Sequence, residues 1–194
     1  MAVLSVRQQA NRIRKWYNKA TQAQTIDGMR WYNEAHSLAA ELAARHGVSI
    51  IQAAQVISVL SPKKKWESNR REAVAIFCEH FTGEKPALGY FATKATIAEC
   101  HSIIAGEFLI PIKRVKTYSF ADNIAYPNTS REITIDRHAL RVAYDDITPA
   151  IDKVGINAYK YARQAYQQVA DSLGIKGYQL QAVCWIVYKN EVNR

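Results

Sequence analysis

The sequence lacks the cysteine patterns that often reveal a metal site. It has three cysteines, Cys78, Cys100 and Cys184, which lie far apart and form no Cys-x-x-Cys pair. A structural zinc site or an iron–sulfur cluster needs several closely spaced ligands, so we expect no metal and no other cofactor. The apolar surroundings of the cysteines indicate free thiols in a reducing compartment.

Long apolar runs are also missing. The first residues, 1–7, hold no apolar segment of the kind found in a signal peptide. No run reaches the length of about 18 apolar residues that a transmembrane helix needs. We therefore expect a cytoplasmic protein with no membrane partner.

Acidic residues are scarce relative to basic ones. The 194 residues include 26 Lys and Arg against 17 Asp and Glu, which gives a formal net charge of +9. This excess favours nucleic acid, an anionic surface or an acidic ligand as partner. A basic protein without such a partner is the alternative. With 48% hydrophobic residues the chain has enough apolar side chains to form a core. We expect the protein to be a monomer.

The alternating pattern typical of strands is absent. Glu132–Ile135 contains three β-branched residues but is too short to begin a sheet. Elsewhere apolar residues recur at three- and four-residue steps, which predicts an all-α fold. Ser49 and Gln52 form a capping-box pattern at the start of a helix that is apolar nearly all round, and Gly47 ends the helix before it. The predicted helices cover residues 5–20, 30–46, 50–60, 67–80, 93–105, 113–125, 137–145, 156–173 and 177–190.

Basic residues gather at two predicted helix starts. Such side chains can contact phosphates, and an aromatic residue beside them can stack on an exposed base. A helix N-terminus itself also attracts phosphate. The first group comprises Lys63, Lys64, Lys65, Arg70 and Arg71 around Trp66, and the second comprises Lys113, Arg114 and Lys116. The alternatives are a solvated loop for the lysines and a core position for Trp66.

One carboxylate stands among bases in the segment 133–143. Asp136 opens a predicted helix and is followed by Arg137, His138 and Arg141. A fixed carboxylate can stabilise a developing cation, and a helix N-cap is its structural alternative. His138 is expected either to contact a base or to pack in the interior, and the two arginines either to contact phosphates or to lie on a solvated face.

Three segments, in this order, resemble motifs of the helix-hairpin-helix DNA glycosylases of the endonuclease III superfamily. Val59-Leu-Ser-Pro-Lys63, with Asn69 downstream, resembles the family's L-L-S-x-Q stretch. Ile110–Thr117 resembles the hairpin L-P-G-V-G-x-K-T, and Ile135–Val142 resembles the signature V-D-T-H-V-x-R-V. The resemblance covers about the central half of the chain and implies a two-lobed, all-α glycosylase-like fold. It implies one domain over 1–194, with one lobe from 1–48 plus 146–194 and a central lobe over 49–145.

The hairpin departs from the family pattern. Ile112 and Arg114 replace the two glycines that let the backbone approach a DNA phosphate. The hairpin is therefore degenerate, and side chains of Lys113 or Arg114 would have to make the contact. Small phage and bacterial relatives, including enzymes that build hypermodified thymines, look similar in the S-P-x-x-x-W-x-x-N stretch and in Gln179–Trp185.

The resemblance implies an enzyme that acts on a damaged or modified base flipped out of DNA. Asp136 would stabilise the cation at C1′ of the sugar, and Lys116 would be a nucleophile with lyase activity. Base contacts would come from Trp66, Asn69, Tyr118 and His138. Two alternatives remain open: a thymine-hypermodification enzyme of the same fold, and a DNA-binding module without catalysis.

Overall fold

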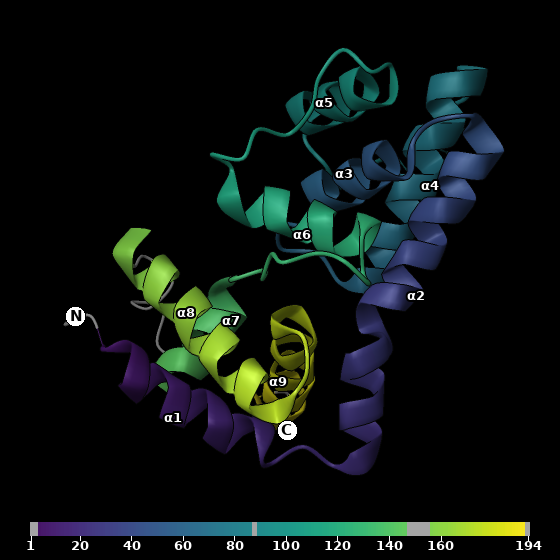
Figure 1. Cartoon of the computed structure of the whole chain (residues 1–194). Helices are drawn as coiled ribbons and strands as arrows, with labels where there is room; N and C mark the ends of the chain where they lie inside the picture. The colour runs from purple at the N-terminus through teal and green to yellow at the C-terminus, as the bar shows by residue number, and fades with distance from the viewer. Residues whose placement is uncertain (1–3, 87–88, 147–155, 193–194) are drawn as a thin grey trace. The chain divides into compact units, whose positions relative to one another are not determined.

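The computed structural model describes residues 4–86, 89–146 and 156–192, and all regular elements within these ranges are α-helices (Figure 1). The prediction of an all-α fold is confirmed. The helices are α1 (Val6–Tyr17), α2 (Gln22–His46), α3 (Ile50–Leu60), α4 (Trp66–Thr82), α5 (Lys94–Ile104), α6 (Val115–Ala125), α7 (Arg137–Tyr144), α8 (Ile156–Leu173) and α9 (Gly177–Val192).

Local signals account for most helix starts. Ser49 caps α3 through the backbone N–H of Gln52, whose side chain bonds back to Ser49, as a capping box requires. Gly47, with φ +69°, follows the end of α2. The second helix begins at 22 rather than 30. The reason is a reciprocal pair at its start, where Thr21 Oγ1 accepts from the N–H of Gln24 and the Gln24 side chain accepts from the N–H of Thr21.

The chain folds into two compact units. The terminal unit comprises residues 1–32 and 131–194, and the middle unit comprises residues 33–130. The expected lobe boundaries were at 48 and 146, whereas the observed ones fall inside α2 and just before Arg131. The second boundary lies earlier because Ile133 and Ile135 are buried in the core shared by α1, α7, α8 and α9.

The terminal unit is held by close helix packing. Its core includes the fully buried rings of Tyr166 and Tyr188 together with Ile13. The first part of α2 approaches α9 so closely that a Cβ on Gly28 would lie 2.6 Å from the Cα of Val183. Only glycine fits at this crossing.

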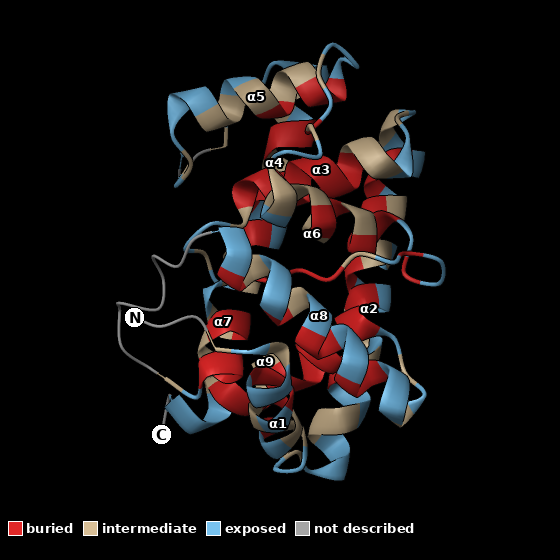
Figure 2. Cartoon of the chain, turned by 60° about the vertical axis from the view of Figure 1, so that its left-hand side comes forward, coloured by how far each residue is buried: buried red, intermediate tan, exposed pale blue. Residues whose placement is uncertain are grey.

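The middle unit is built around α3. Every residue of α3 from 53 to 60 is buried, as Figure 2 shows, and the helix packs against α4, α5 and α6. Asn69 of α4 donates from Nδ2 to the carbonyl of Ile57 at 3.1 Å. Ser58 donates from Oγ to the carbonyl of Thr117 in α6 at 2.7 Å. These two bonds tie the C-terminal half of α3 to its neighbours.

Among the described helices, we find none whose length and apolar character together would suffice to cross a bilayer.

Candidate functional site

Asp136 stands where a buried extended segment becomes a helix. Ile133 and Ile135 are buried, and Asp136 itself is extended and half-buried at the N-cap of α7. Its Oδ1 accepts the backbone N–H of Ala139 at 2.8 Å. The carboxylate is therefore a helix cap, held in one orientation, with part of its surface still open to solvent.

The first turn of α7 is fixed from two other helices. The buried hydroxyl of Tyr166 in α8 donates to the carbonyl of Ala139 at 3.3 Å. The ring of His138 lies 5.5 Å from the ring of Tyr188 in α9, whose hydroxyl accepts from Arg141 at 3.4 Å. These contacts hold Asp136, His138 and Arg141 on one rigid helix start.

Burial lowers the pKa of His138, and the nearby carboxylate of Asp136 opposes that shift. The imidazole is therefore neutral near pH 7, and it is half-buried beside Tyr188. Arg137, by contrast, is exposed. The α7 start thus combines a fixed carboxylate, a neutral imidazole and two guanidinium groups, which is a set able to stabilise positive charge and hold an anionic ligand.

The basic loop before α4 contains one lysine that points inward. Lys63 and Lys65 are exposed, and Lys63 adopts a left-handed conformation with φ 60°. Lys64 instead forms a buried ion pair with Glu72, and burial lowers the pKa of Lys64. The expectation that Lys64 contacts phosphate is corrected, because its ammonium is already paired inside the middle unit.

Asn69 is also structural. It is 2% exposed and bound to the carbonyl of Ile57, so it cannot contact a base as expected from the sequence. Trp66, at the first position of α4, is half-buried. Arg70 and Arg71 are exposed, and Arg70 lies 3.8 Å from Glu67 on the same helix.

The hairpin that joins α5 to α6 is a tight turn. The carbonyl of Pro111 accepts the N–H of Arg114 at 2.9 Å, which puts Ile112 and Lys113 at the two corners of the turn. Both corner residues are exposed. The side chain of Arg114 pairs with Glu99 of α5 but is still partly exposed, so its contact with phosphate stays a prediction.

Lys116 lies in the first turn of α6 and is exposed, whereas Tyr118, two residues later, is half-buried. No side chain caps α6 at Arg114. The Ser58–Thr117 hydrogen bond sets the start of α6 beside the end of α3. The loop that carries Lys63 and Lys65 follows α3, so both basic segments belong to the middle unit.

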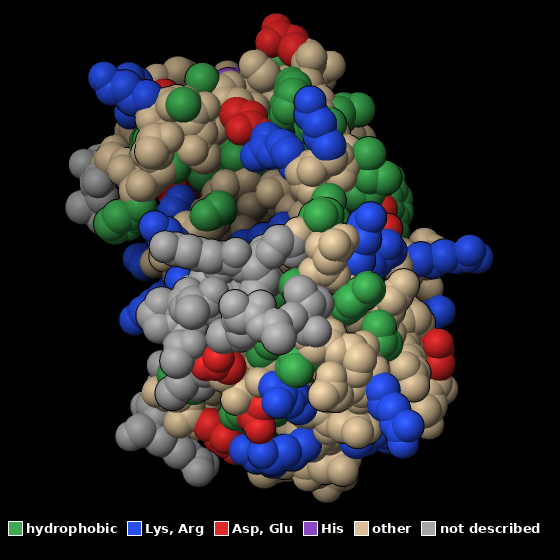
Figure 3. Space-filling view, turned by 90° about the vertical axis from the view of Figure 1, so that its left-hand side faces the viewer, with side chains coloured by type: hydrophobic (Ala, Val, Ile, Leu, Met, Phe, Trp, Pro, Cys, Tyr) green, Lys and Arg blue, Asp and Glu red, His purple; other side chains and the backbone are tan. Residues whose placement is uncertain are grey.

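The predicted site residues divide between the two units. Asp136, Arg137, His138 and Arg141 belong to the terminal unit, and all the others, including Lys116, belong to the middle unit. Figure 3 shows basic side chains scattered over the face it draws, with acidic side chains beside several of them. Within the described residues, no group of three or more His, Cys, Asp or Glu side chains could hold a metal ion.

Sequence reasoning missed the acidic partners of two bases. Glu72 pairs with Lys64, and Glu99 pairs with Arg114. Each pair joins a loop to a helix packed beside it. The spacing of the two residues in the sequence therefore does not predict the pair. The excess of bases near two predicted helix starts was the only available signal that partners were needed.

Searches of the curated proteins and of the solved structures returned no significant match to this chain. A family described only as a family of unknown function, DUF7178, matches residues 1–192. The chain belongs to this family.

Proposed function

We propose that the protein is a DNA glycosylase-like enzyme that acts on a damaged or modified base flipped out of DNA. The observation that carries the proposal is the state of Asp136, a carboxylate fixed by the Ala139 N–H and still half-exposed among basic side chains. Cleavage of a glycosidic bond passes through a cationic sugar, and a pre-oriented carboxylate lowers the energy of that state.

Lys116 is the proposed nucleophile. Its amine would attack C1′ of the sugar and displace the base, giving a Schiff base that can lead to strand cleavage. The exposed position of Lys116 at the start of α6 leaves its amine accessible to DNA.

The test of Asp136 exploits its role as a cap. Asparagine also caps helices well, so Asp136→Asn removes the negative charge and keeps an oxygen for the Ala139 N–H. We expect release of uracil, oxidised, alkylated or hydroxymethylated bases from duplex oligonucleotides to fall by about a hundredfold or more. The matched control is Asp171→Asn, an exposed aspartate of α8 in the same unit, which should keep the wild-type rate.

Trapping with borohydride tests Lys116. The wild-type protein should form a covalent adduct with the DNA, and Lys116→Gln should form none. An adduct that persists in Lys116→Gln removes this lysine as nucleophile. Base release that is unchanged in Asp136→Asn sinks the assignment of the carboxylate.

A DNA-binding module without catalysis is the second candidate, because the Asp136 carboxylate already has a structural task as the cap of α7. DNA that is bound but keeps its mass and all its bases would favour the module. A mass increase on the DNA in the presence of an amine would instead favour a thymine-modification enzyme, with Asp136 acting as a base toward the amine.

A further inference from the structure

The hairpin between α5 and α6 presents aliphatic side chains to solvent. Ile112 is 70% exposed and Leu109 is 59% exposed. Ile112 occupies a corner of the turn closed by Pro111 and Arg114. In the family that the hairpin resembles, this position is a glycine, whose backbone approaches phosphate. A branched aliphatic side chain at the corner needs a different explanation.

Contacts with α3 and α5 hold the residues on both sides of the turn. Ile110 is 3% exposed, and its N–H donates to the side chain of Gln55 in α3 at 3.3 Å. Arg114 is paired with Glu99 of α5, and Thr117 is bound by Ser58 of α3. Because its base is anchored to two helices, the turn cannot easily fold Ile112 inward. The side chain is already displayed in the position that a partner would meet, which reduces the entropy lost on binding.

Positive charge surrounds this apolar tip. Lys113 follows Ile112 directly and Lys116 lies in the first turn of α6, and both are exposed. Neither lysine makes an ion pair with any other residue that the structure describes. The uncapped start of α6 adds the positive end of its dipole. An apolar side chain with cations beside it is complementary to a partner whose stacked apolar groups lie between rows of negative charge.

We propose that Ile112 is a wedge that enters a base-pair step of duplex DNA, while Lys113 contacts an adjacent phosphate. Aliphatic wedges of this kind unstack a step and bend the duplex, usually from the minor groove. The inference rests on the proposed function only in taking DNA as the partner, and it replaces the missing glycine contact with a side-chain contact.

The chemistry favours DNA over a lipid surface. Binding within a bilayer interface needs a broad apolar helix face, whereas the hairpin offers only Ile112 and Leu109. The loop bearing Lys63 and Lys65 follows α3, which is tied to the start of α6 by the Ser58–Thr117 bond. Cations spread over two neighbouring segments suit the phosphates that line a groove.

The experiment uses the whole chain and a duplex with 2-aminopurine, whose fluorescence rises when it is unstacked. Wild-type protein should raise the fluorescence at saturation. Ile112→Ala should abolish most of that rise and weaken binding severalfold, with an unchanged dependence on salt. Lys113→Gln should weaken binding and lower the salt slope by about one unit while the rise at saturation is kept. Ile26→Ala, an exposed isoleucine of α2 that is 42% exposed, is the matched control and should behave as wild type.

Three results separate the possible failures. No binding of wild-type protein to duplex DNA would overturn both the wedge and the proposed function. Binding with no fluorescence rise at any step of the duplex, or with a rise that survives Ile112→Ala, would overturn the wedge alone. Binding to phosphatidylcholine–phosphatidylserine vesicles that is lost in Ile112→Ala, without unstacking of DNA, would overturn the wedge in favour of a membrane surface.

Discussion

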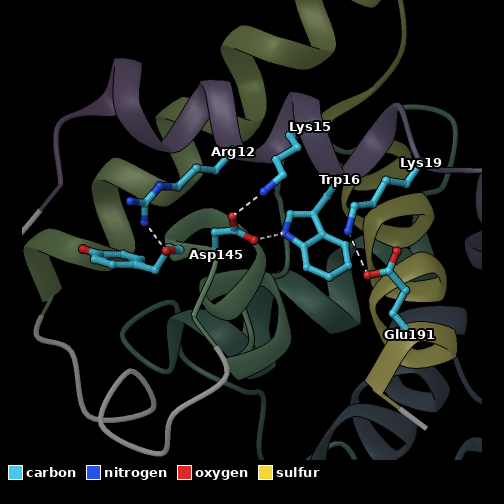
Figure 4. Close-up of polar contacts among 7 residues, drawn as sticks. Arg12, Lys15, Trp16, Lys19, Asp145 and Glu191 are labelled. Atoms are coloured by element: carbon cyan, nitrogen blue, oxygen red, sulfur yellow. Dashed lines mark hydrogen bonds and ion pairs between the residues drawn. The ribbon is translucent and has the colours of Figure 1, made fainter. Parts of the chain in front are cut away.

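Helix α1 and the hairpin segment 109–116 are both basic, and they use their charges in opposite ways. On α1, Lys15 pairs with Asp145 and Lys19 pairs with Glu191, each at 2.8 Å, and Arg12 donates to a backbone carbonyl of α7 (Figure 4). These cations hold the terminal unit together.

The hairpin lysines, by contrast, are exposed and unpaired within the described parts of the chain. The formal net charge of +9 therefore does not locate a binding surface. Cations that the fold already uses are poor candidates for a partner, and those left out of its contacts are better ones. Substitutions in the terminal unit and in the hairpin test this contrast.

The largest effect on stability is expected from Gly28→Ala. This substitution tests the close packing of α2 against α9 in the terminal unit. The new Cβ would lie 2.6 Å from the Cα of Val183, and a backbone atom cannot move aside as a side chain can. We expect the free energy of unfolding to fall by about 3 kcal/mol, measured by urea denaturation. Ala44→Val, at an exposed position of α2, should change it by less than about 0.5 kcal/mol. An unchanged denaturation midpoint in Gly28→Ala would refute the close approach of α2 and α9.

A smaller effect is expected from Asp145→Asn, which removes a charge that α1 depends on. Asp145 accepts from Lys15 and, through its other oxygen, from Trp16 Nε1 at 2.9 Å. We expect a loss of about 1 kcal/mol, since solvent screens this partly exposed site. Asp27→Asn, on the exposed face of α2, is the control and should have little effect.

The same contact predicts a dependence on pH. The hydrogen bond from Lys15 lowers the pKa of Asp145 in the folded state. The stabilisation is therefore complete above the ordinary carboxyl pKa of about 4 and is lost as the pH falls through the lowered value. The difference in unfolding free energy between wild type and Asp145→Asn should shrink as the pH is lowered below about 4. A difference that stays constant down to acid pH would argue against this ion pair.

The smallest effect on stability is expected from Lys113→Gln and Lys116→Gln in the hairpin. Because neither lysine is paired within the described residues, each change should alter the unfolding free energy by less than about 0.5 kcal/mol. Lys15→Gln on α1 is the comparison and should cost more, because it breaks the contact with Asp145. An equal loss of unfolding free energy in Lys15→Gln, Lys113→Gln and Lys116→Gln would contradict the contrast between the two regions.

Local signals in the sequence predicted the all-α class and most of the helices. Ser49 with Gln52 marked the start of α3, and Ser61 before Pro62 marked its end, because each signal acts on neighbouring backbone groups. The position of Asp136 at a helix start was predicted in the same way.

Contacts between separate helices were not predictable. Nothing in the sequence distinguishes Lys64, which pairs with Glu72, from its exposed neighbours Lys63 and Lys65. Asn69 was expected to contact a base because it matched a motif, and it is buried against Ile57. Burial and pairing of these side chains depend on where other helices lie, which hydrophobic periodicity does not specify.

The way the chain divides into units sets an order for folding during synthesis. The middle unit is a continuous stretch, 33–130, so it can fold as soon as it leaves the ribosome. Helix α1 is made before the middle unit, whereas its packing partners α7, α8 and α9 are made after it. The core residues Ile13 and Trp16 of α1 therefore stay exposed until α7, α8 and α9 have been translated. We expect this helix to be the segment that most needs protection by chaperones while the protein is being made.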